Sequence, residues 1–290
     1  MAKIIPPSEL IINPDGSVFH LHLHPEQLTD RIILVGDPAR VDMVAEFFDT
    51  RDFEVSSREF HTIGGTYGGK PIMCLSHGIG PDNIDIVINE LDALANVDFA
   101  TREVKDKLRR LTMVRIGTSG ALQPELSLGT PVIARHSVGF DGVLNYYAGR
   151  NEIADLDMER EFCEHTGWNP LWAKPYFVEA DEELVDRIGR DDMVRGITIS
   201  AVGFYGPQGR ELRLPLANPD LNSRIESFRY KDRRITNYEM ESAPLAGLGR
   251  LMGHSCMTVC SIIANRYNNN ANPNYKSGVR DLVATVLERI

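Results

Sequence analysis

Short apolar runs rich in β-branched residues alternate along this chain with stretches in which apolar residues recur every three or four positions. The short runs are typical of buried strands, and the longer stretches are typical of amphipathic helices. Strands are predicted over residues 32–35, 71–75, 111–116, 131–137, 196–202 and 256–263. The alternation favours an α/β protein in which helices cover both faces of a central sheet.

Helices are predicted between these strands and at the end of the chain. The first follows residues 36–40 and runs through residue 47, and others cover residues 84–94, 239–252 and 277–290. The charged insertion TREVKDKLRR, residues 101–110, is predicted to be a solvated helix, and residues 268–274 a polar loop. Neither a repeat nor a linker divides the sequence, so its 290 residues suit one large domain, although two smaller domains remain open.

Composition and charge narrow the expected partners. A formal net charge of −10 argues against a general basic face, so we expect neither nucleic acid nor an anionic membrane as a partner. The amino-terminal residues lack the apolar region of a signal peptide, and no apolar run approaches the length of a membrane span.

The cysteines are Cys74, Cys163, Cys256 and Cys260. They form no CxxC pair and no His/Cys metal spacing, so we expect no metal site and a soluble, cytoplasmic protein.

Residues 203–210, GFYGPQGR, bring an aromatic ring, a carboxamide and a guanidinium close together in sequence. Gln208 can donate and accept hydrogen bonds in one plane, as the edge of an imide requires, and Arg210 can donate to a carbonyl oxygen that gains negative charge. Phe204 can cover the face of a ring. This set suits a planar, polar heterocycle. The alternative is an ordinary Gly/Pro turn that carries a solvated Gln and Arg.

Two segments that follow predicted strands suit an anion. Gly36 permits close backbone approach, and Arg40 lies near the start of a helix, where free N–H groups favour negative charge. In residues 115–120, RIGTSG, small residues are expected to leave backbone amides open in a turn, beside Arg115 and two hydroxyls. No P-loop and no GxGxxG motif is present, so free phosphate fits better than a dinucleotide. Alternatively, Arg115 is a strand residue in a structural ion pair.

A pair of carboxylates precedes the helix that contains Pro244, which the first turn of a helix tolerates. Glu239 and Glu241 are two positions apart and cannot share a helical face. One of them can accept hydrogen bonds from a sugar diol while the other serves a structural role. The alternative is that both stabilise the helix dipole from the first turn.

Taken in order, seven short segments resemble the nucleoside phosphorylase-I family and, within it, the members that cleave uridine. The segments are residues 18–21, 36–41, 57–60, 115–120, 204–210, 238–242 and 265–266. The resemblance implies a single-domain three-layer α/β/α sandwich over residues 1–290 with a central mixed sheet. It also implies a pentosyltransferase that converts uridine and phosphate reversibly to uracil and ribose 1-phosphate in pyrimidine salvage, with no cofactor.

The resemblance also assigns the site residues. Those expected to hold phosphate are Gly36, Arg40, Arg115 and Thr118, with Arg58 from a neighbouring subunit. Those expected to hold ribose are Met240, Glu241 and the neighbour's His20, and those expected to receive uracil are Phe204, Gln208 and Arg210. Arg115, Arg210 and Glu241 are the expected catalytic residues, because they face the charges that phosphate, uracil and ribose carry in the transition state. The implied assembly is a homodimer with shared active sites, alone or within a hexamer.

Departures from the family pattern matter for the substrate. Purine-cleaving relatives carry an aspartate that protonates the purine ring, where residues 261–266 here read SIIANR, so a pyrimidine is the expected base. Ile262 and Ile263 are expected to form an apolar wall beside carbon five of uracil. Residues 78–83, GIGPDN, depart from the usual Gly-Pro-Ser ending. A monovalent cation site of some bacterial members, which would use Glu59 and Ile79, therefore stays open. The alternative functions are a purine phosphorylase, a nucleosidase of the same fold, and a nucleoside-binding protein without turnover.

Overall fold

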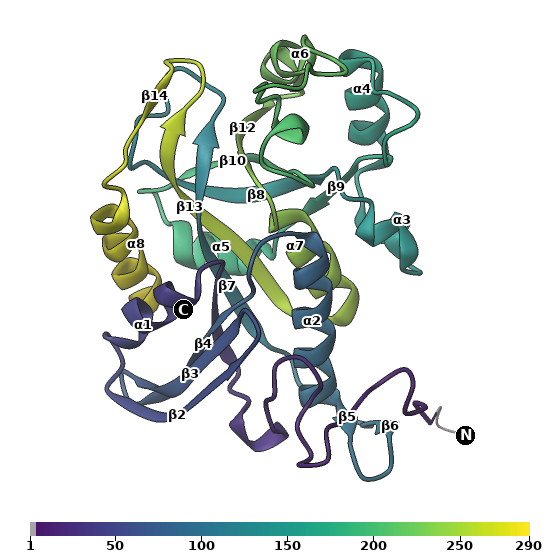
Figure 1. The fold of residues 1–290 in the computed structure, drawn as a ribbon, viewed down its shortest axis with the longest axis vertical. Coiled ribbons are helices and arrows are strands. Elements are labelled where there is room, and N and C mark those ends of the chain that lie inside the picture. Colours follow the sequence, from purple (N-terminus) through teal and green to yellow (C-terminus); the bar gives the residue numbers. More distant parts are fainter. Residues whose placement is uncertain (1–3) are drawn as a thin grey trace.

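The computed structural model describes residues 4–290, so residues 1–3 of the predicted domain lie outside the described part. Its main feature is one mixed sheet with the order β11-β12-β10-β8-β13-β7-β1-β4-β3-β2, to which β9 and β14 add at β8 and β13 (Figure 1). The strands are β1 (Arg31–Val35), β2 (Thr50–Ser57), β3 (Phe60–Tyr67), β4 (Lys70–Ser76), β7 (Thr112–Ala121), β8 (Pro131–Gly139), β9 (Tyr176–Glu179), β10 (Val194–Ser200), β11 (Arg229–Tyr230), β12 (Arg233–Glu239), β13 (Ser255–Asn265) and β14 (Asn270–Ala271).

Helices cover both faces of this sheet, as predicted. One layer contains α1 (Pro38–Ala45), α5 (Glu182–Gly189) and α8 (Lys276–Arg289), and the other contains α2 (Pro81–Asn96) and α7 (Ser242–Met252). Side chains alternate between the faces of a strand. In β1, Ile32 and Leu34 therefore belong to the core cluster under α2 and α7, whereas Ile33 and Val35 belong to the one under α1, α5 and α8. The three-layer α/β/α sandwich is confirmed.

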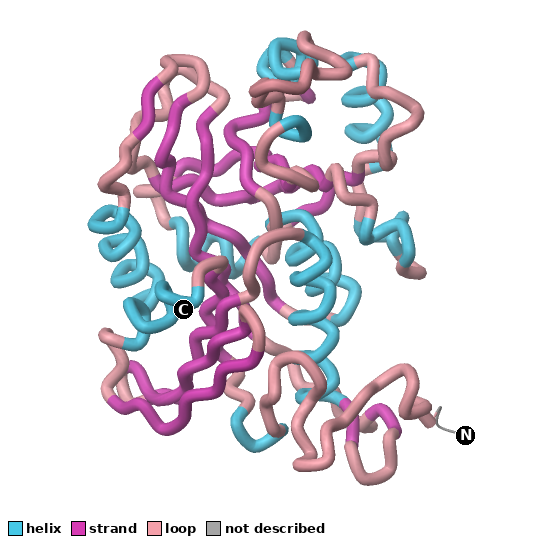
Figure 2. Tube along the Cα trace, in the orientation of Figure 1, coloured by secondary structure: helices cyan, strands magenta, loops and turns pink. Residues whose placement is uncertain are grey.

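A smaller aromatic cluster lies at one end of the sheet, where α4 (Leu156–Thr166) and α6 (Leu221–Ser227) pack beside β9 and β12 (Figure 2). The short α3 (Arg150–Ile153) precedes α4. The buried residues of this cluster include Phe140, Phe162, Phe177 and Phe228, and Trp168 and Trp172 pack against it.

Several predicted elements need correction. Residues 101–110 form no solvated helix: β5 (Val97–Asp98) and β6 (Glu103–Val104) make a short hairpin there. Contacts with the amino-terminal segment replace helical hydrogen bonds, since Arg102 Nε donates to the Ile5 carbonyl at 2.8 Å and Arg109 Nε to Asp30 Oδ1 at 2.5 Å. The polar loop over residues 268–274 contributes β14, which pairs with β13. The hairpin of β2 and β3 was not predicted.

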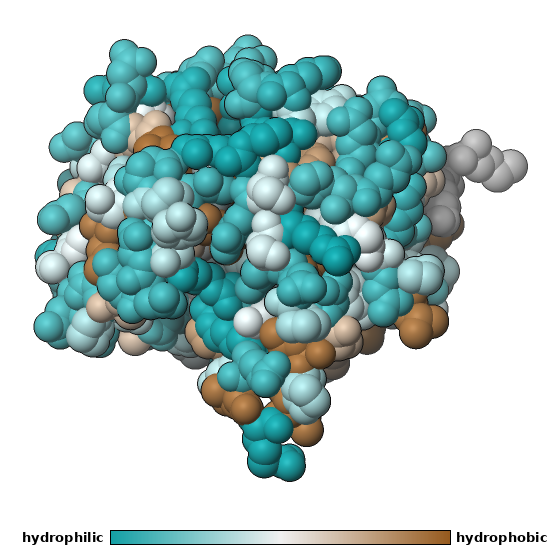
Figure 3. Space-filling model, turned by 90° about the horizontal axis from the view of Figure 1, so that it is seen from above, coloured by the Kyte–Doolittle hydropathy of each residue, from teal (hydrophilic) through white to brown (hydrophobic). Residues whose placement is uncertain are grey.

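The exterior is largely polar. On the face drawn in Figure 3, hydrophilic residues predominate and hydrophobic residues are scattered among them or gather on one protrusion. Among the described residues, no helix combines the length and the apolar character that crossing a bilayer requires.

Candidate active site

The candidate site lies beside β7, at the point where this strand changes neighbours. One edge of β7 pairs with β13 along its length. The other edge pairs with β1 from Thr112 to Arg115, and with β12 only at Gly120 and Ala121. Residues 116–119 lie in the gap between β1 and β12. Ligands of open α/β sheets bind where neighbouring strands part in this way.

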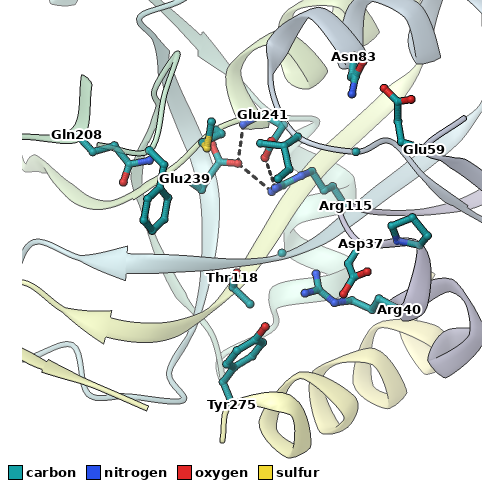
Figure 4. Close-up of a pocket in the computed structure, with 17 residues that line it drawn as sticks. Asp37, Arg40, Glu59, Asn83, Arg115, Thr118, Gln208, Glu239, Glu241 and Tyr275 are labelled. Carbon is teal, nitrogen blue, oxygen red and sulfur yellow. Dashed lines mark hydrogen bonds and ion pairs between the residues drawn. The ribbon is translucent and has the colours of Figure 1, made fainter. Parts of the chain in front are cut away.

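A cavity of about 710 Å³ opens at this gap (Figure 4). Eight of the predicted site residues line it: Gly36, Arg40, Arg115, Thr118, Phe204, Gln208, Met240 and Glu241. Strand β7 and the segments that follow β1 and β12, together with residues 204–208, bring them together. The cavity has room for a nucleoside and a small anion.

The predicted glycine-rich turn after Arg115 is wrong. Residues 117–120 lie inside β7, where Gly117 pairs with Cys260 and Thr118 with Ser261. Their amides therefore do not form an open turn. The unpaired edge of β7 instead helps to position Arg40. The Ile116 carbonyl, which lies on this edge, accepts a hydrogen bond from Arg40 Nη1 at 3.3 Å. An anion at this point would meet the side chains of Arg40 and Thr118 and the backbone N–H groups of β7 that face the gap.

Arg115 is buried at the centre of an ion-pair network. Its Nη1 lies 2.8 Å from Glu239 Oε2, its Nη2 pairs with Glu241, and its Nε donates to His77 Nε2 at 3.1 Å. Burial alone would lower the pKa of Arg115, but Glu241 and Glu239 outweigh burial and raise it. Since Nη1 also donates to Cys260 Sγ, one N–H of Nη2 remains for a ligand. The structural interpretation of Arg115 is thus correct, and the residue also lines the cavity.

The two carboxylates have different environments. Glu239 ends β12, and its oxygens accept hydrogen bonds from the backbone N–H groups of Glu241 (2.8 Å) and Ser242 (2.9 Å). It therefore secures the start of α7. Glu241 immediately precedes α7 and accepts from the Gly80 N–H at 2.7 Å. The alternative in which both occupy the first helical turn is wrong.

The opposite end of the cavity carries Phe204 and Gln208. Gln208 is buried, and its Oε1 accepts a hydrogen bond from Arg210 Nη1 at 2.5 Å. The Arg210 guanidinium carbon lies 3.8 Å from the centre of the Phe204 ring. Arg210 does not line the cavity in this structure. It stacks on the ring and orients the Gln208 amide.

His20 and Arg58 also lie outside the cavity lining. The His20 ring contacts Phe19 edge to face, and the Arg58 guanidinium lies 5.7 Å from the centre of the Phe19 ring. His20 Nδ1 lies 2.6 Å from Glu90 Oε1. Arg58 has a φ of +56°, which a residue with a Cβ rarely adopts. The two predicted residues thus gather around Phe19.

Other cavity residues were missed or misplaced by sequence reasoning. Asp37, Asn83 and Tyr275 line the cavity, and no local motif distinguishes the last two. Two further predicted residues do not line the cavity. Ile262 packs against Ala121, Leu126 and Val132, so its predicted place beside the base is wrong. Ile263 is not part of the cavity lining either.

The residues considered for a cation lie at the cavity mouth. Both Glu59 and Ile79 line the cavity, as does Asn83, which was not part of the predicted cation site. A Cβ on Gly78 would meet Asn83 Nδ2 at 2.5 Å and Glu59 Cγ at 2.9 Å, so the backbone of Gly78 packs closely against these side chains. Within residues 4–290, no group of three His, Cys, Asp or Glu side chains has the arrangement of a metal site.

Comparisons with known proteins agree with the observed fold. The family model described as the phosphorylase superfamily matches residues 30–289. A uridine phosphorylase from Thermococcus kodakarensis is 30% identical over 261 residues, which are 88% of this chain and 80% of that protein. One from Escherichia coli is 30% identical over 260 residues, 87% of each chain. The crystal structure of a Trypanosoma brucei nucleoside phosphorylase, described as showing uridine phosphorylase activity, aligns with a TM-score of 0.88 at 26% identity over 97% of this chain and 98% of that one.

Proposed function

The chain belongs to the phosphorylase superfamily, and we infer that it catalyses the reversible phosphorolysis of uridine to uracil and ribose 1-phosphate. One observation carries this function: a single cavity has Arg40 and Thr118 near one end, Gln208 at the other, and Glu241 between them (Figure 4). In phosphorolysis of a nucleoside, the ribose lies between the attacking phosphate and the base. Arg40 and Thr118 would therefore hold phosphate, Glu241 the ribose, and Gln208 the base. Phosphate is a substrate, and the reaction needs no cofactor.

The chemistry follows from where charge develops. A phosphate oxygen bonds to C1′ of ribose as the bond from C1′ to N1 of uracil breaks, and the electron pair of that bond remains on uracil. Positive charge on the ribose is stabilised by the Glu241 carboxylate. Negative charge on the uracil oxygens is stabilised by the Gln208 amide and by the positive charge of Arg210, which lies behind that amide and orients it. Arg40, Thr118 and the remaining N–H of Arg115 hold phosphate in line for attack.

The dependence on phosphate tests this function directly. Uridine incubated with the protein should release uracil only when phosphate is present, and arsenate should replace phosphate. Uracil and ribose 1-phosphate are quantified by chromatography. Release without phosphate would instead identify a nucleosidase, and binding of uridine without release would identify a nucleoside-binding protein.

Glu241 gives a prediction for pH. Burial raises the pKa of Glu241 to about 7, against the opposing effect of Arg115. The ionised carboxylate stabilises the ribose cation, so kcat/KM should rise as the pH rises through about 7. Glu241→Gln should lower kcat/KM by about 10²-fold or more. Phosphate itself loses a proton in this range, so this variant is the matched control. If the unmodified protein and Glu241→Gln had the same pH profile, the pH dependence could not be assigned to Glu241.

We propose further that two subunits share each active site. Ile79 and Phe204 line the cavity yet expose 72% and 52% of their surface, so the described chain leaves the mouth uncovered. In the proposed dimer, the group formed by His20, Phe19 and Arg58 enters the cavity of the other subunit. His20 would meet the 5′-hydroxyl and Arg58 the phosphate. A C2 dimer contains two such sites.

Complementation tests the shared site. His20→Ala/Arg58→Ala and Arg115→Ala/Arg210→Ala should each be inactive. When they are unfolded together and refolded as a mixture, each mixed dimer should have one intact cavity and one that carries all four changes. Activity should return to about half of the wild-type value per mixed dimer. Verified mixed dimers without activity would show that the residues act within their own subunit.

The cellular compartment is a further proposal. All four cysteines carry free thiols in the structure, which is usual for proteins of the reducing cytoplasm. We therefore place the enzyme there, where it would serve pyrimidine salvage.

A further inference from the structure

A second cavity, which we call the tryptophan cavity, lies behind the loop that carries Gln208. Its volume is about 410 Å³. Gly206, Pro207 and Gly209 line this cavity, whereas Gln208 lines the active site. The loop is therefore a thin wall between the two cavities. None of the roles proposed above for phosphate, ribose or uracil uses the tryptophan cavity.

Aromatic rings form its walls. Phe140, Trp168 and Trp172 line it, with ring centres 4.6 Å apart for Phe140 and Trp168 and 5.0 Å apart for Trp168 and Trp172. The two indoles meet at 80°, so their faces point in different directions. Both tryptophans are only half-buried. A ring that presents its face to a space of this size can attract a cation, because the face of an aromatic ring carries partial negative charge.

A carboxylate adds to this negative character. Asp141 lines the tryptophan cavity and is half-buried, and its oxygens accept from the Tyr176 hydroxyl at 2.8 and 3.0 Å and from the Val143 N–H at 2.8 Å. Because the Tyr176 hydroxyl has a single proton, these contacts use two donors and leave acceptor capacity on the carboxylate. Arg150 and Lys174, basic residues of the same region, pair instead with Glu159. No ion pair within residues 4–290 includes Asp141, and burial raises the pKa of its carboxyl, so a bound cation would supply the counter-charge that favours the ionised form.

We propose that the tryptophan cavity binds a small organic ammonium ion. The ammonium group would lie beside the Asp141 carboxylate, and its apolar substituent would pack against Trp168 and Trp172. Neither a neutral nor an anionic molecule of the same shape would gain the charge interaction. The proposal depends on the walls of this cavity alone and not on the reaction catalysed next to it.

Tryptophan fluorescence reports on this site directly, because Trp168 and Trp172 are the two tryptophans of the sequence. Benzylammonium, benzyl alcohol and phenylacetate have similar shapes and charges of different sign, and each is titrated at pH 7. Benzylammonium should change the emission saturably and bind about tenfold more tightly than benzyl alcohol, since a hydrogen bond to a charged group contributes at least that factor. Phenylacetate should bind more weakly than either.

Asp141→Asn tests the role of the carboxylate, because Asn keeps an oxygen that accepts from Tyr176 and Val143. This variant should bind benzylammonium and benzyl alcohol equally, whereas Asp232→Asn, the same change at an exposed position outside the cavity, should keep the preference. The three titrations of the unmodified protein decide the matter even if Asp141→Asn does not fold. The proposal is overturned by equal binding of benzyl alcohol, by tighter binding of phenylacetate, by no saturable change up to about 10 mM, or by a preference that survives in Asp141→Asn.

Discussion

Replacing Arg115 with alanine should lower kcat/KM for uridine phosphorolysis by about 10²–10³-fold, the usual effect of removing one donor that stabilises transition-state charge. The same change should destabilise the protein. Glu239 and Glu241 both pair with Arg115 in the interior and would lose their counter-charge. Breaking a buried ion pair from one side costs about 3–5 kcal/mol in the free energy of unfolding. Steady-state kinetics with varied phosphate and denaturant unfolding measure the two effects.

Two variants serve as controls for Arg115→Ala. Arg115→Lys retains one positive charge but cannot reach Glu239, Glu241 and His77 in fixed directions, so it should recover part of the stability and little activity. Arg40→Ala should weaken phosphate binding with little loss of stability, because its hydrogen bond to the Ile116 carbonyl involves no buried carboxylate. Unchanged stability and phosphate dependence in Arg115→Ala would contradict the central position of Arg115.

Uridine should be cleaved about 10⁴-fold more efficiently than inosine, as expected for a site whose buried polar groups must be paired by the substrate. Gln208 is buried and its amide is oriented by Arg210, so a purine would leave this amide without its partners. Gln208→Ala should reduce the ratio of kcat/KM values to below about 10². Arg210→Ala should lower mainly kcat, since its charge matters most when uracil becomes anionic.

Parallel assays with uridine and inosine measure this ratio for each protein. Arg234→Ala, a change at an exposed ion pair with Glu125, is a suitable control and should leave the ratio unchanged. If the unmodified protein cleaves inosine as efficiently as uridine, the assignment of Gln208 and Arg210 to the base is wrong.

Apolar periodicity predicted the centre of the sheet correctly, because strands such as β1 are buried on both faces. It could not predict the hairpin of β2 and β3, because β2 is mostly exposed and carries polar residues such as Arg51 and Asp52. Residues 101–110 have a helical charge pattern, but Arg102 and Arg109 find partners near Ile5 and Asp30, far away in sequence. Tertiary hydrogen bonds of this kind override local preference.

The candidate site shows the same limit. The residue types of segments 36–40, 115–118, 204–210 and 239–241 indicated which groups meet in one cavity. Sequence spacing did not indicate that Arg115 would pair with both Glu239 and Glu241, because the sheet order that brings β7 beside β12 is not local. Nor did it place Gly117 inside a strand, since a glycine-rich segment is usually a turn.

The gap beside β7 also bears on when the enzyme becomes active as it folds. The strands on either side of that gap, β1 and β12, are about two hundred residues apart in sequence. A chain that has arranged only its amino-terminal half holds Arg40 and Arg115 but lacks Glu241. Contacts between such distant segments form slowly, because they close long loops. Turnover should therefore return after dilution from denaturant only with the docking of β12, later than most of the secondary structure.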